Sequence, residues 1–235
     1  MPMLEVNGVN SFYGKAQVLN DLNFTVDRGT VVALLGRNGA GKTTTMKSIM
    51  QLVRPRQGKI IYQGQDITGW PSHKVARNGL GYVPEERRIF TQLTVLENLE
   101  VGRQPPRDGC TTWTEDMVFD LFPNLAERRH NRGKALSGGE QQMLTIARTL
   151  MGNPAFILLD EPSEGIAPVI VEQMARVILQ LKAEGLTVLL SEQNLHFAQA
   201  VADGVVIIEH GTQKFVGTLA ALQSQPEIRD QYLSV

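Results

Sequence analysis

The chain is poor in cysteine and has almost no net charge. It has 235 residues, a single cysteine (Cys110) and a formal net charge of -1 at pH 7. One cysteine excludes an internal disulfide and fits a reduced, cytosolic compartment, so we expect Cys110 to be an incidental loop residue. The near-neutral charge argues against a surface built to hold nucleic-acid phosphates, and we expect no nucleic-acid partner.

Long apolar runs are also missing. No run approaches the roughly 20 residues that span a bilayer, and Met1–Glu5 lacks the basic and apolar regions of a signal peptide. We therefore expect any membrane function to depend on a partner. The residues present are 42% hydrophobic and 20% charged, the balance of a globular protein with a real core.

Hydrophobic periodicity predicts an α/β protein. Alternation over 4–26 predicts strands, and the apolar run Thr30–Leu35 predicts a buried parallel strand. Helical spacing covers 46–53, where Pro55 stops it, and 170–181. Further strands are predicted at 58–62, 80–83, 156–159, 187–190 and 205–208. We predict one domain, 1–235, with a doubly wound core at about 1–84 and 153–220, a helical subdomain at 85–152 and a C-terminal packing tail at 221–235.

A phosphate-binding loop follows the strand at 30–35. Gly36-Arg37-Asn38-Gly39-Ala40-Gly41-Lys42-Thr43 matches G-x-x-x-x-G-K-[ST]. Its glycines let backbone N–H groups point at a phosphate, and the next helix adds its positive N-terminal dipole. We expect Lys42 to reach the β- and γ-phosphates, Thr43 to bind Mg²⁺, and Thr44 to belong to the nucleotide site. The alternative is a simple glycine-rich turn, but the strand before and the helix after favour the phosphate loop.

An acidic pair ends the strand at 156–159. Asp160 is placed to hold the Mg²⁺ shell, and Glu161 to orient and polarise the attacking water. The alternative is that the acidic pair has only a structural role. The presence of Lys42 and Thr43 in the same chain makes this alternative less favoured. These residues together predict a nucleoside triphosphatase (NTPase).

A second motif is Leu136-Ser137-Gly138-Gly139-Glu140, just before a helical pattern. Ser137 and Glu140 have the spacing of an N-terminal capping box. Gly138 and Gly139 are poor helix formers, and a simple cap does not require glycine at these positions. The exposed N–H groups of glycines at a helix start are, however, suited to bind a phosphate. Since the chain already has a phosphate loop, we expect this motif to serve a nucleotide held by another subunit.

Leu136–Gln142 resembles the signature of the ATP-binding cassette (ABC) ATPases, and the resemblance covers essentially the whole chain. It implies an α/β, P-loop NTPase (RecA-like) core with an N-terminal antiparallel β subdomain and a lateral helical subdomain. It also implies ATP hydrolysis between two head-to-tail cassettes, with ATP between one phosphate loop and the other's signature residues (Ser137, Gly138, Gly139 and Glu140). Tyr13 matches the aromatic residue that stacks on adenine, with Val18 nearby; packing within a strand is the alternative for Tyr13.

Three positions depart from the general family pattern. Glu85 stands where most cassettes have a glutamine that links Mg²⁺ to the permease, and Gln193 where most have a histidine that contacts the γ-phosphate. Ala167 replaces a usual aspartate. Gln193 can still donate a hydrogen bond to phosphate, and Glu85 can bind the metal directly. We expect an asymmetric pair in which this chain's own site is the slower one; neutral variation is the alternative.

Four further segments resemble the LivF-type ATPases of branched-chain amino-acid importers: 82–90, 93–99, 160–168 and 191–194. The resemblance implies a peripheral subunit on the cytoplasmic face of the bacterial inner membrane, with ATP and Mg²⁺ as cofactors. Its implied partners are a second homologous ATPase (a homodimer in isolation is the alternative), two transmembrane permease subunits and, indirectly, a periplasmic substrate-binding protein. A family groove for the permease's coupling helix would lie by Arg87, Arg88, Ile89, Phe90 and Leu93.

The cargo is not visible in the sequence, because the ATPase never touches it. The nearest alternative is an importer of urea or short amides. A soluble cassette of DNA repair or translation is less favoured, because those usually have two cassettes in one chain or long coiled-coil insertions. A lipid or polysaccharide exporter ATPase matches 85–90 less well.

Overall fold

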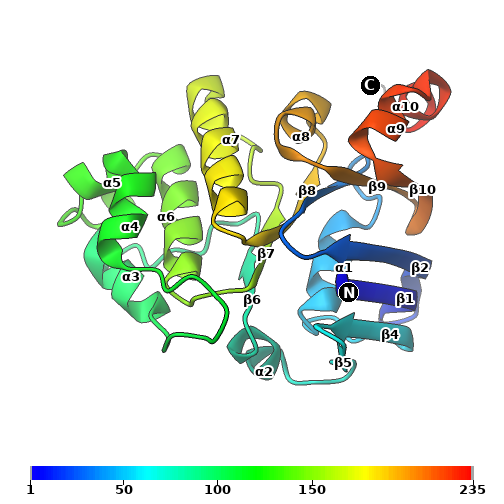
Figure 1. Ribbon diagram of the computed structural model, residues 1–235, viewed down its shortest axis with the longest axis horizontal. Coiled ribbons are helices and arrows are strands. Elements are labelled where there is room, and N and C mark those ends of the chain that lie inside the picture. Colours follow the sequence, from blue (N-terminus) through cyan, green and yellow to red (C-terminus); the bar gives the residue numbers. More distant parts are fainter. Residues whose placement is uncertain (1, 234–235) are drawn as a thin grey trace.

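The computed structural model describes residues 2–233 and begins with an antiparallel sheet (Figure 1). Its strands are β1 (Pro2–Tyr13), β2 (Ala16–Asp27), β4 (Gln57–Tyr62) and β5 (Gln65–Asp66), in the order β2-β1-β4-β5. β1 pairs with β2 and with β4, both antiparallel. The predicted strands over 4–26 and 58–62 are confirmed, and so is an N-terminal antiparallel sheet.

The second sheet has six strands in the order β10-β9-β3-β8-β7-β6. They are β3 (Val31–Leu35), β6 (Leu80–Val83), β7 (Phe156–Asp160), β8 (Thr187–Glu192), β9 (Gly204–Glu209) and β10 (Thr212–Thr218). Five are parallel, and β10 joins the edge antiparallel. β3 and β7 both pair with β8, so the carboxyl ends of these three strands meet at one edge, where an open α/β sheet binds its ligand.

Ten α-helices surround the sheets in the described chain (Figure 1). They are α1 (Lys42–Ile49), α2 (Ser72–Arg77), α3 (Val95–Gly102), α4 (Glu115–Leu121), α5 (Pro123–Glu127), α6 (Gly138–Leu150), α7 (Pro168–Ala183), α8 (Leu195–Val201), α9 (Leu219–Gln223) and α10 (Pro226–Leu233), with a 3₁₀ turn at Gly133–Ala135. The helix predicted at 46–53 instead ends at Ile49, and Gln51 has a left-handed φ of 58° well before Pro55. The tail is helical over α9 and α10; residues 234 and 235 lie outside the described residues.

The six-stranded sheet is buried on both faces. Along β3, Val31, Ala33 and Leu35 belong to one apolar cluster, and Val32 and Leu34 belong to the other. This alternation follows from the two-residue repeat of a strand. The second cluster joins the sheet to α1 and to the antiparallel sheet, so the phosphate loop before α1 is fixed from both sides.

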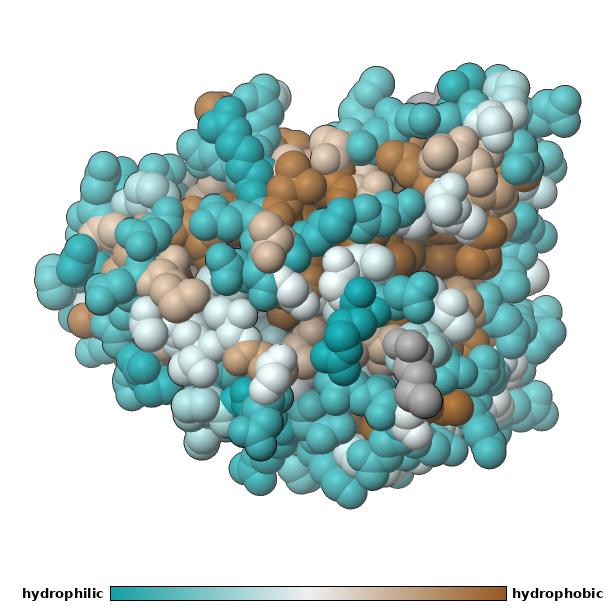
Figure 2. Space-filling view, viewed as in Figure 1, coloured by the Kyte–Doolittle hydropathy of each residue, from teal (hydrophilic) through white to brown (hydrophobic). Residues whose placement is uncertain are grey.

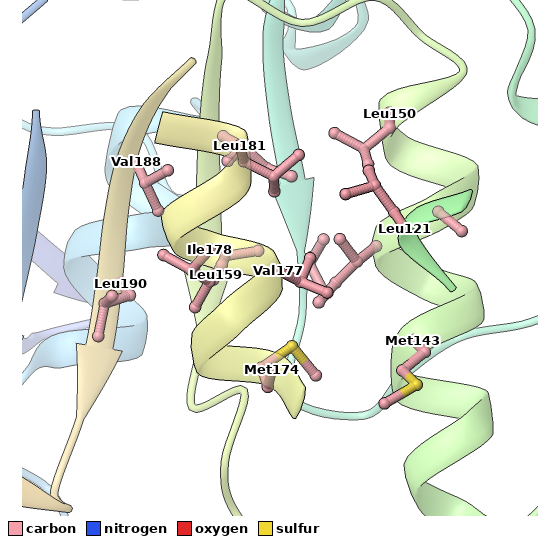
Figure 3. Close-up of a cluster of buried hydrophobic side chains, with 14 of the residues drawn as sticks. Leu121, Met143, Leu150, Leu159, Met174, Val177, Ile178, Leu181, Val188 and Leu190 are labelled. Atoms are coloured by element: carbon pink, nitrogen blue, oxygen red, sulfur yellow. The ribbon is translucent and has the colours of Figure 1, made fainter. Parts of the chain in front are cut away.

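The first cluster joins the sheet to the helices of 95–150. Figure 3 shows α7 between β8 and α6, with apolar side chains on both of its sides. The buried residues in this view include Leu121, Leu159, Met174, Val177, Ile178 and Leu190. The lateral helices therefore pack on the core through a continuous apolar contact.

The surface in the same orientation is mainly hydrophilic. Figure 2 shows brown residues gathered in a strip over α7, α8 and the C-terminal elements, within a largely teal face. Within 2–233, no helix combines the length and apolar character needed to cross a membrane.

Candidate nucleotide site

The loop between β3 and α1 requires glycine at specific positions. Gly39 and Gly41 have left-handed φ values of 78° and 111°, which side chains with a Cβ adopt at a cost. A Cβ on Gly36 would lie 2.3 Å from the carbonyl oxygen of Ile208. The loop can therefore pass close to β9 and turn its backbone inward only with these glycines.

Lys42 is held over this loop. Its ammonium donates to the carbonyl oxygens of Gly36 (2.8 Å) and Arg37 (3.2 Å), and lies 3.1 Å from Oε1 of Glu161. The Lys42 side chain is 3% exposed. A phosphate bound in the loop would meet the desolvated Lys42 ammonium, whose three N–H donors point to the loop and to Glu161.

Asp160 is fully buried and accepts three hydrogen bonds. Its Oδ1 accepts from the hydroxyls of Thr43 (3.1 Å) and Ser191 (2.7 Å), and its Oδ2 from the phenol of Tyr82 (3.0 Å). Burial, and then the Asp160 carboxylate, raise the pKa of Tyr82, so the phenol keeps its proton and donates. These hydrogen bonds hold the Asp160 carboxylate beside Thr43, the other residue predicted to bind Mg²⁺.

Glu161 and Gln193, the two predicted catalytic residues, contact each other. Gln193 Nε2 donates to Glu161 Oε2 over 2.9 Å, while the other Glu161 oxygen faces Lys42. The Glu161 backbone has a left-handed φ of 48° and its N–H donates to Ser191. The neighbouring strand end thus fixes a sparsely populated backbone conformation, a feature common at functional sites.

Lys42, Thr43 and Glu161 line one cavity of about 310 Å³. Its lining is Tyr13, Val18, Asn38, Gly39, Gly41, Lys42, Thr43, Thr44, Glu85 and Glu161. Tyr13 is 48% exposed, so its ring is not fully packed within its strand. Gly36 and Ala40 are buried in the loop, and Arg37 lines a neighbouring cavity of about 430 Å³. Each of these residues is one that the sequence assigns to the nucleotide, the Mg²⁺ ion or catalysis.

The donor set fits a magnesium ion. Thr43 and Asp160 offer hard oxygen donors, and Mg²⁺ usually takes one or two protein oxygens beside phosphate and water. Within 2–233 no group of three or more His, Cys, Asp or Glu side chains is placed to hold a metal ion. Partial burial, and then the carboxylates of Glu161 and Asp160, raise the pKa of Glu85, because both disfavour its ionised form.

The second motif lies elsewhere in the chain. Ser137 caps α6: its Oγ accepts from Glu140 N over 3.3 Å, and Glu140 Oε2 accepts from Ser137 N over 2.7 Å. The predicted capping box is confirmed. Gly138 packs under the Arg87 guanidinium, since a Cβ there would lie 2.7 Å from Nη1. None of 137–140 lines the cavity at Lys42, so one chain does not bring the two motifs together.

Sequence reasoning assigned no role to four residues that support the site. Tyr82 and Ser191 hold Asp160, and Ser163 bonds to the buried carboxylate of Glu192. Their signal was position: Tyr82, Ser191 and Glu192 lie at or near the carboxyl ends of β6 and β8, which flank β7.

A family model for ABC transporters matches residues 19–164, which include the phosphate loop, the signature and the acidic pair. The chain belongs to the ABC transporter family. It is 43% identical over 98% of its length to the high-affinity branched-chain amino-acid transport ATP-binding protein BraG of Pseudomonas aeruginosa, 99% of which is covered. It is 37% identical, over 99% of its length, to the lipopolysaccharide export ATP-binding protein LptB of Haemophilus influenzae, 98% of which is covered.

Solved structures agree with the fold of this ABC ATPase. An ATP-binding subunit of an ABC transporter superposes with a TM-score of 0.80 at 31% identity, covering 97% of this chain and 94% of that one. A nucleotide-free ATP-binding cassette gives a TM-score of 0.82 at 25% identity, with 97% of each chain covered. The predicted α/β P-loop NTPase fold is confirmed, and the chain is an ATP-binding, ATP-hydrolysing member of the family.

Proposed function

We propose that this ABC ATPase hydrolyses Mg²⁺-ATP to power an importer of branched-chain or related amino acids, as a peripheral subunit on the cytoplasmic face of the bacterial inner membrane. The observation that carries the hydrolytic part is the convergence of Lys42, Glu161 and Gln193 beside the phosphate loop. The 43% identity to BraG, against 37% to LptB, favours amino-acid import.

In this proposal the chain works by positioning and electrostatics. The loop N–H groups and Lys42 bind the β- and γ-phosphates. Thr43 and Asp160, with Glu85 beside them, would hold Mg²⁺, which would supply charge neutralisation at the phosphates. Glu161 orients the attacking water, and Gln193 donates to the γ-phosphate once ATP displaces part of the contact between Lys42, Glu161 and Gln193.

A second cassette completes the site. The backbone N–H groups of Gly138 and Gly139, next to the capping residue Ser137, begin a 13-residue helix and lie outside the chain's own cavity. We propose that they bind ATP held by a homologous ATPase, whose own signature covers the ATP at Lys42. We also propose that the chain divides into a core, a helical subdomain at 85–152 and a C-terminal tail.

Two permease subunits are the proposed membrane partners. A cavity of about 630 Å³ lies between α2 on one side and α3 and α6 on the other. Phe90 (47% exposed), Leu52 (52%) and Val101 (52%) line it together with Arg148. Its apolar side chains and nearby arginines support docking of a permease segment beside the predicted residues Arg87–Leu93. A periplasmic substrate-binding protein would deliver the cargo.

Lipopolysaccharide export is the second candidate, because LptB-type relatives share 36–37% identity over nearly the whole chain. Import of urea or short amides uses the same machine with another cargo. A soluble non-transport cassette is the alternative from a different class.

The first test is capture of the tagged full-length chain from gently solubilised native membranes, with co-purifying proteins identified by mass spectrometry. Two permeases and a second, different cassette are expected. Uptake of radiolabelled leucine and of urea in a deletion strain, complemented by wild type or by Lys42→Ala, then assigns the cargo. Recovery of lipopolysaccharide-transport or nucleic-acid partners instead would reject the importer assignment.

A further inference from the structure

Glu192 is a buried carboxylate that the proposed mechanism does not use. It ends β8, next to Gln193, and is 2% exposed. Burying a carboxylate is unfavourable unless its oxygens accept hydrogen bonds. Within residues 2–233, the hydrogen-bond donors to Glu192 come from two short segments: the β7–α7 loop (161–167) and the β8–α8 turn (193–194).

The contacts join these two segments through one side chain. Glu192 Oε1 accepts from the backbone N–H of Ser163 (3.0 Å), and Oε2 accepts from the Ser163 hydroxyl (2.9 Å) and from Asn194 N (3.4 Å). Gln193 lies between Glu192 and Asn194 in the chain, and Glu161 lies two residues before Ser163. The Glu192–Ser163 contact and the Gln193–Glu161 hydrogen bond therefore close a ring around the two proposed catalytic residues.

The ring is not needed to hold the sheet. β8 is already paired on both sides, with β3 and β7, and Ser191 anchors the Glu161 backbone without help from Glu192. Burial raises the pKa of Glu192 to about 7, so its ionised form is one that the folded protein tolerates at a cost. A group that lowers stability, yet makes three contacts to two loops beside the reacting groups, has the properties of a positioning element.

We propose that Glu192 is a positioning residue for ATP hydrolysis: through Ser163 it fixes the β7–α7 loop to the β8–α8 turn, so that Glu161 and Gln193 keep one geometry. This inference rests on the proposed roles of Glu161 and Gln193. Glu192 touches neither the nucleotide-loop cavity nor the phosphate loop, so it acts on the rate of hydrolysis and not on ATP binding.

Three variants separate positioning from stability. Glu192→Leu removes the charge and the acceptors at similar volume. Glu192→Gln keeps an oxygen for Ser163 N and offers an N–H to the Ser163 hydroxyl, which can accept it. Ser163→Ala removes only the hydroxyl contact. The control is Thr187→Val on the same strand, because Thr187 is also fully buried and its hydroxyl accepts a backbone hydrogen bond from Gly29 (2.9 Å), far from the loop.

In the transporter complex carrying the tagged full-length chain, we expect Glu192→Leu to lower kcat about tenfold while KM for ATP changes less than about twofold, because misplacement affects the reacting geometry. Glu192→Gln should stay within about threefold of wild type and Ser163→Ala should lose about threefold, as expected for partial loss of one contact. The double variant Glu192→Leu/Ser163→Ala should be no slower than Glu192→Leu, because both changes break the same link. Thr187→Val should keep its kcat.

Each outcome decides. An unchanged kcat in Glu192→Leu, a double variant whose loss is the product of the single losses, or a loss that follows Tm across all variants including Thr187→Val would overturn the positioning role. Glu161→Gln is measured in parallel. If it retains the wild-type kcat, the assignment of Glu161 fails, and that result is distinct from any result at Glu192.

Discussion

At the scale of single residues, the site consists of charged groups that restrain one another. Lys42 contacts Glu161, Glu161 accepts from Gln193, and Asp160 accepts from three hydroxyls. Such desolvated, hydrogen-bonded groups are pre-organised for charge that develops during phosphoryl transfer. Two predictions belong to this scale.

Glu161→Gln should lower ATP hydrolysis about 10²- to 10³-fold, because an amide cannot polarise the water as a carboxylate does. ATP binding, followed with a fluorescent analogue, should be kept, since Lys42 and the loop are intact. Glu164→Gln is the matched control, an exposed carboxylate on the same loop. Equal activity of the two variants would show that Glu161 is not the group that acts on water.

Glu192 makes stability depend on pH. Its pKa rises from an ordinary 4.5 to about 7 by burial, so the folded chain binds more protons than the unfolded chain between these values. The free energy of unfolding should therefore fall as pH rises from about 5 to about 8, by about 3 kcal/mol from this group. Urea unfolding should show this slope in wild type and a flatter one in Glu192→Gln. The same slope in both proteins would assign it to other groups.

At the scale of elements, two helices start with the same capping box. Ser137 and Glu140 begin α6, and Thr94 and Glu97 begin α3. Of these two helices, only α6 starts with two glycines. The proposal that α6 binds the partner's nucleotide explains this difference, because glycine N–H groups are accessible to a phosphate.

Ser137→Ala and Thr94→Ala should each lower the free energy of unfolding by about 1 kcal/mol, the usual effect of losing a cap. Only Ser137→Ala should also lower the ATPase rate of the assembled pair, because Ser137 would contact the partner's nucleotide. Thermal unfolding and ATPase assays on both variants test this. Equal losses of ATPase activity in the two variants would show that Ser137 acts only as a helix cap.

At the scale of the whole molecule, the chain holds a phosphate loop and a signature motif in separate places, so the complete site belongs to a pair. Glu85 and Gln193 replace residues usual in the family, and they lie beside the proposed metal ligands and Glu161. We expect unequal sites in a heteromeric transporter, with this chain's own site the slower.

Changing Lys42 to alanine should therefore reduce the steady-state ATPase rate of the assembled pair less than changing the matching lysine of the partner. The reason is that Gln193 cannot carry the positive charge of an imidazolium at the γ-phosphate. The two purified complexes are compared at saturating Mg²⁺-ATP. Equal losses would reject the asymmetry.

The local patterns determined much of this protein from sequence. Continuous apolar runs predicted the buried strands. The phosphate loop was predictable because its backbone can turn inward only with glycines such as Gly39 and Gly41. The acidic pair was predictable because residues at the carboxyl ends of parallel strands meet at one edge. The capping box at Ser137 needed only a three-residue spacing.

Tertiary structure decided what distant segments do to each other. Tyr82, Ser191 and Asp160 meet because β6, β7 and β8 are neighbours, an order that periodicity does not encode. The ring through Glu192 and Ser163 joins residues 29 positions apart, and the exposure of Tyr13 is likewise a property of the folded chain. Local spacing fixes which groups a segment offers, whereas strand order and packing fix which of them come within hydrogen-bonding distance.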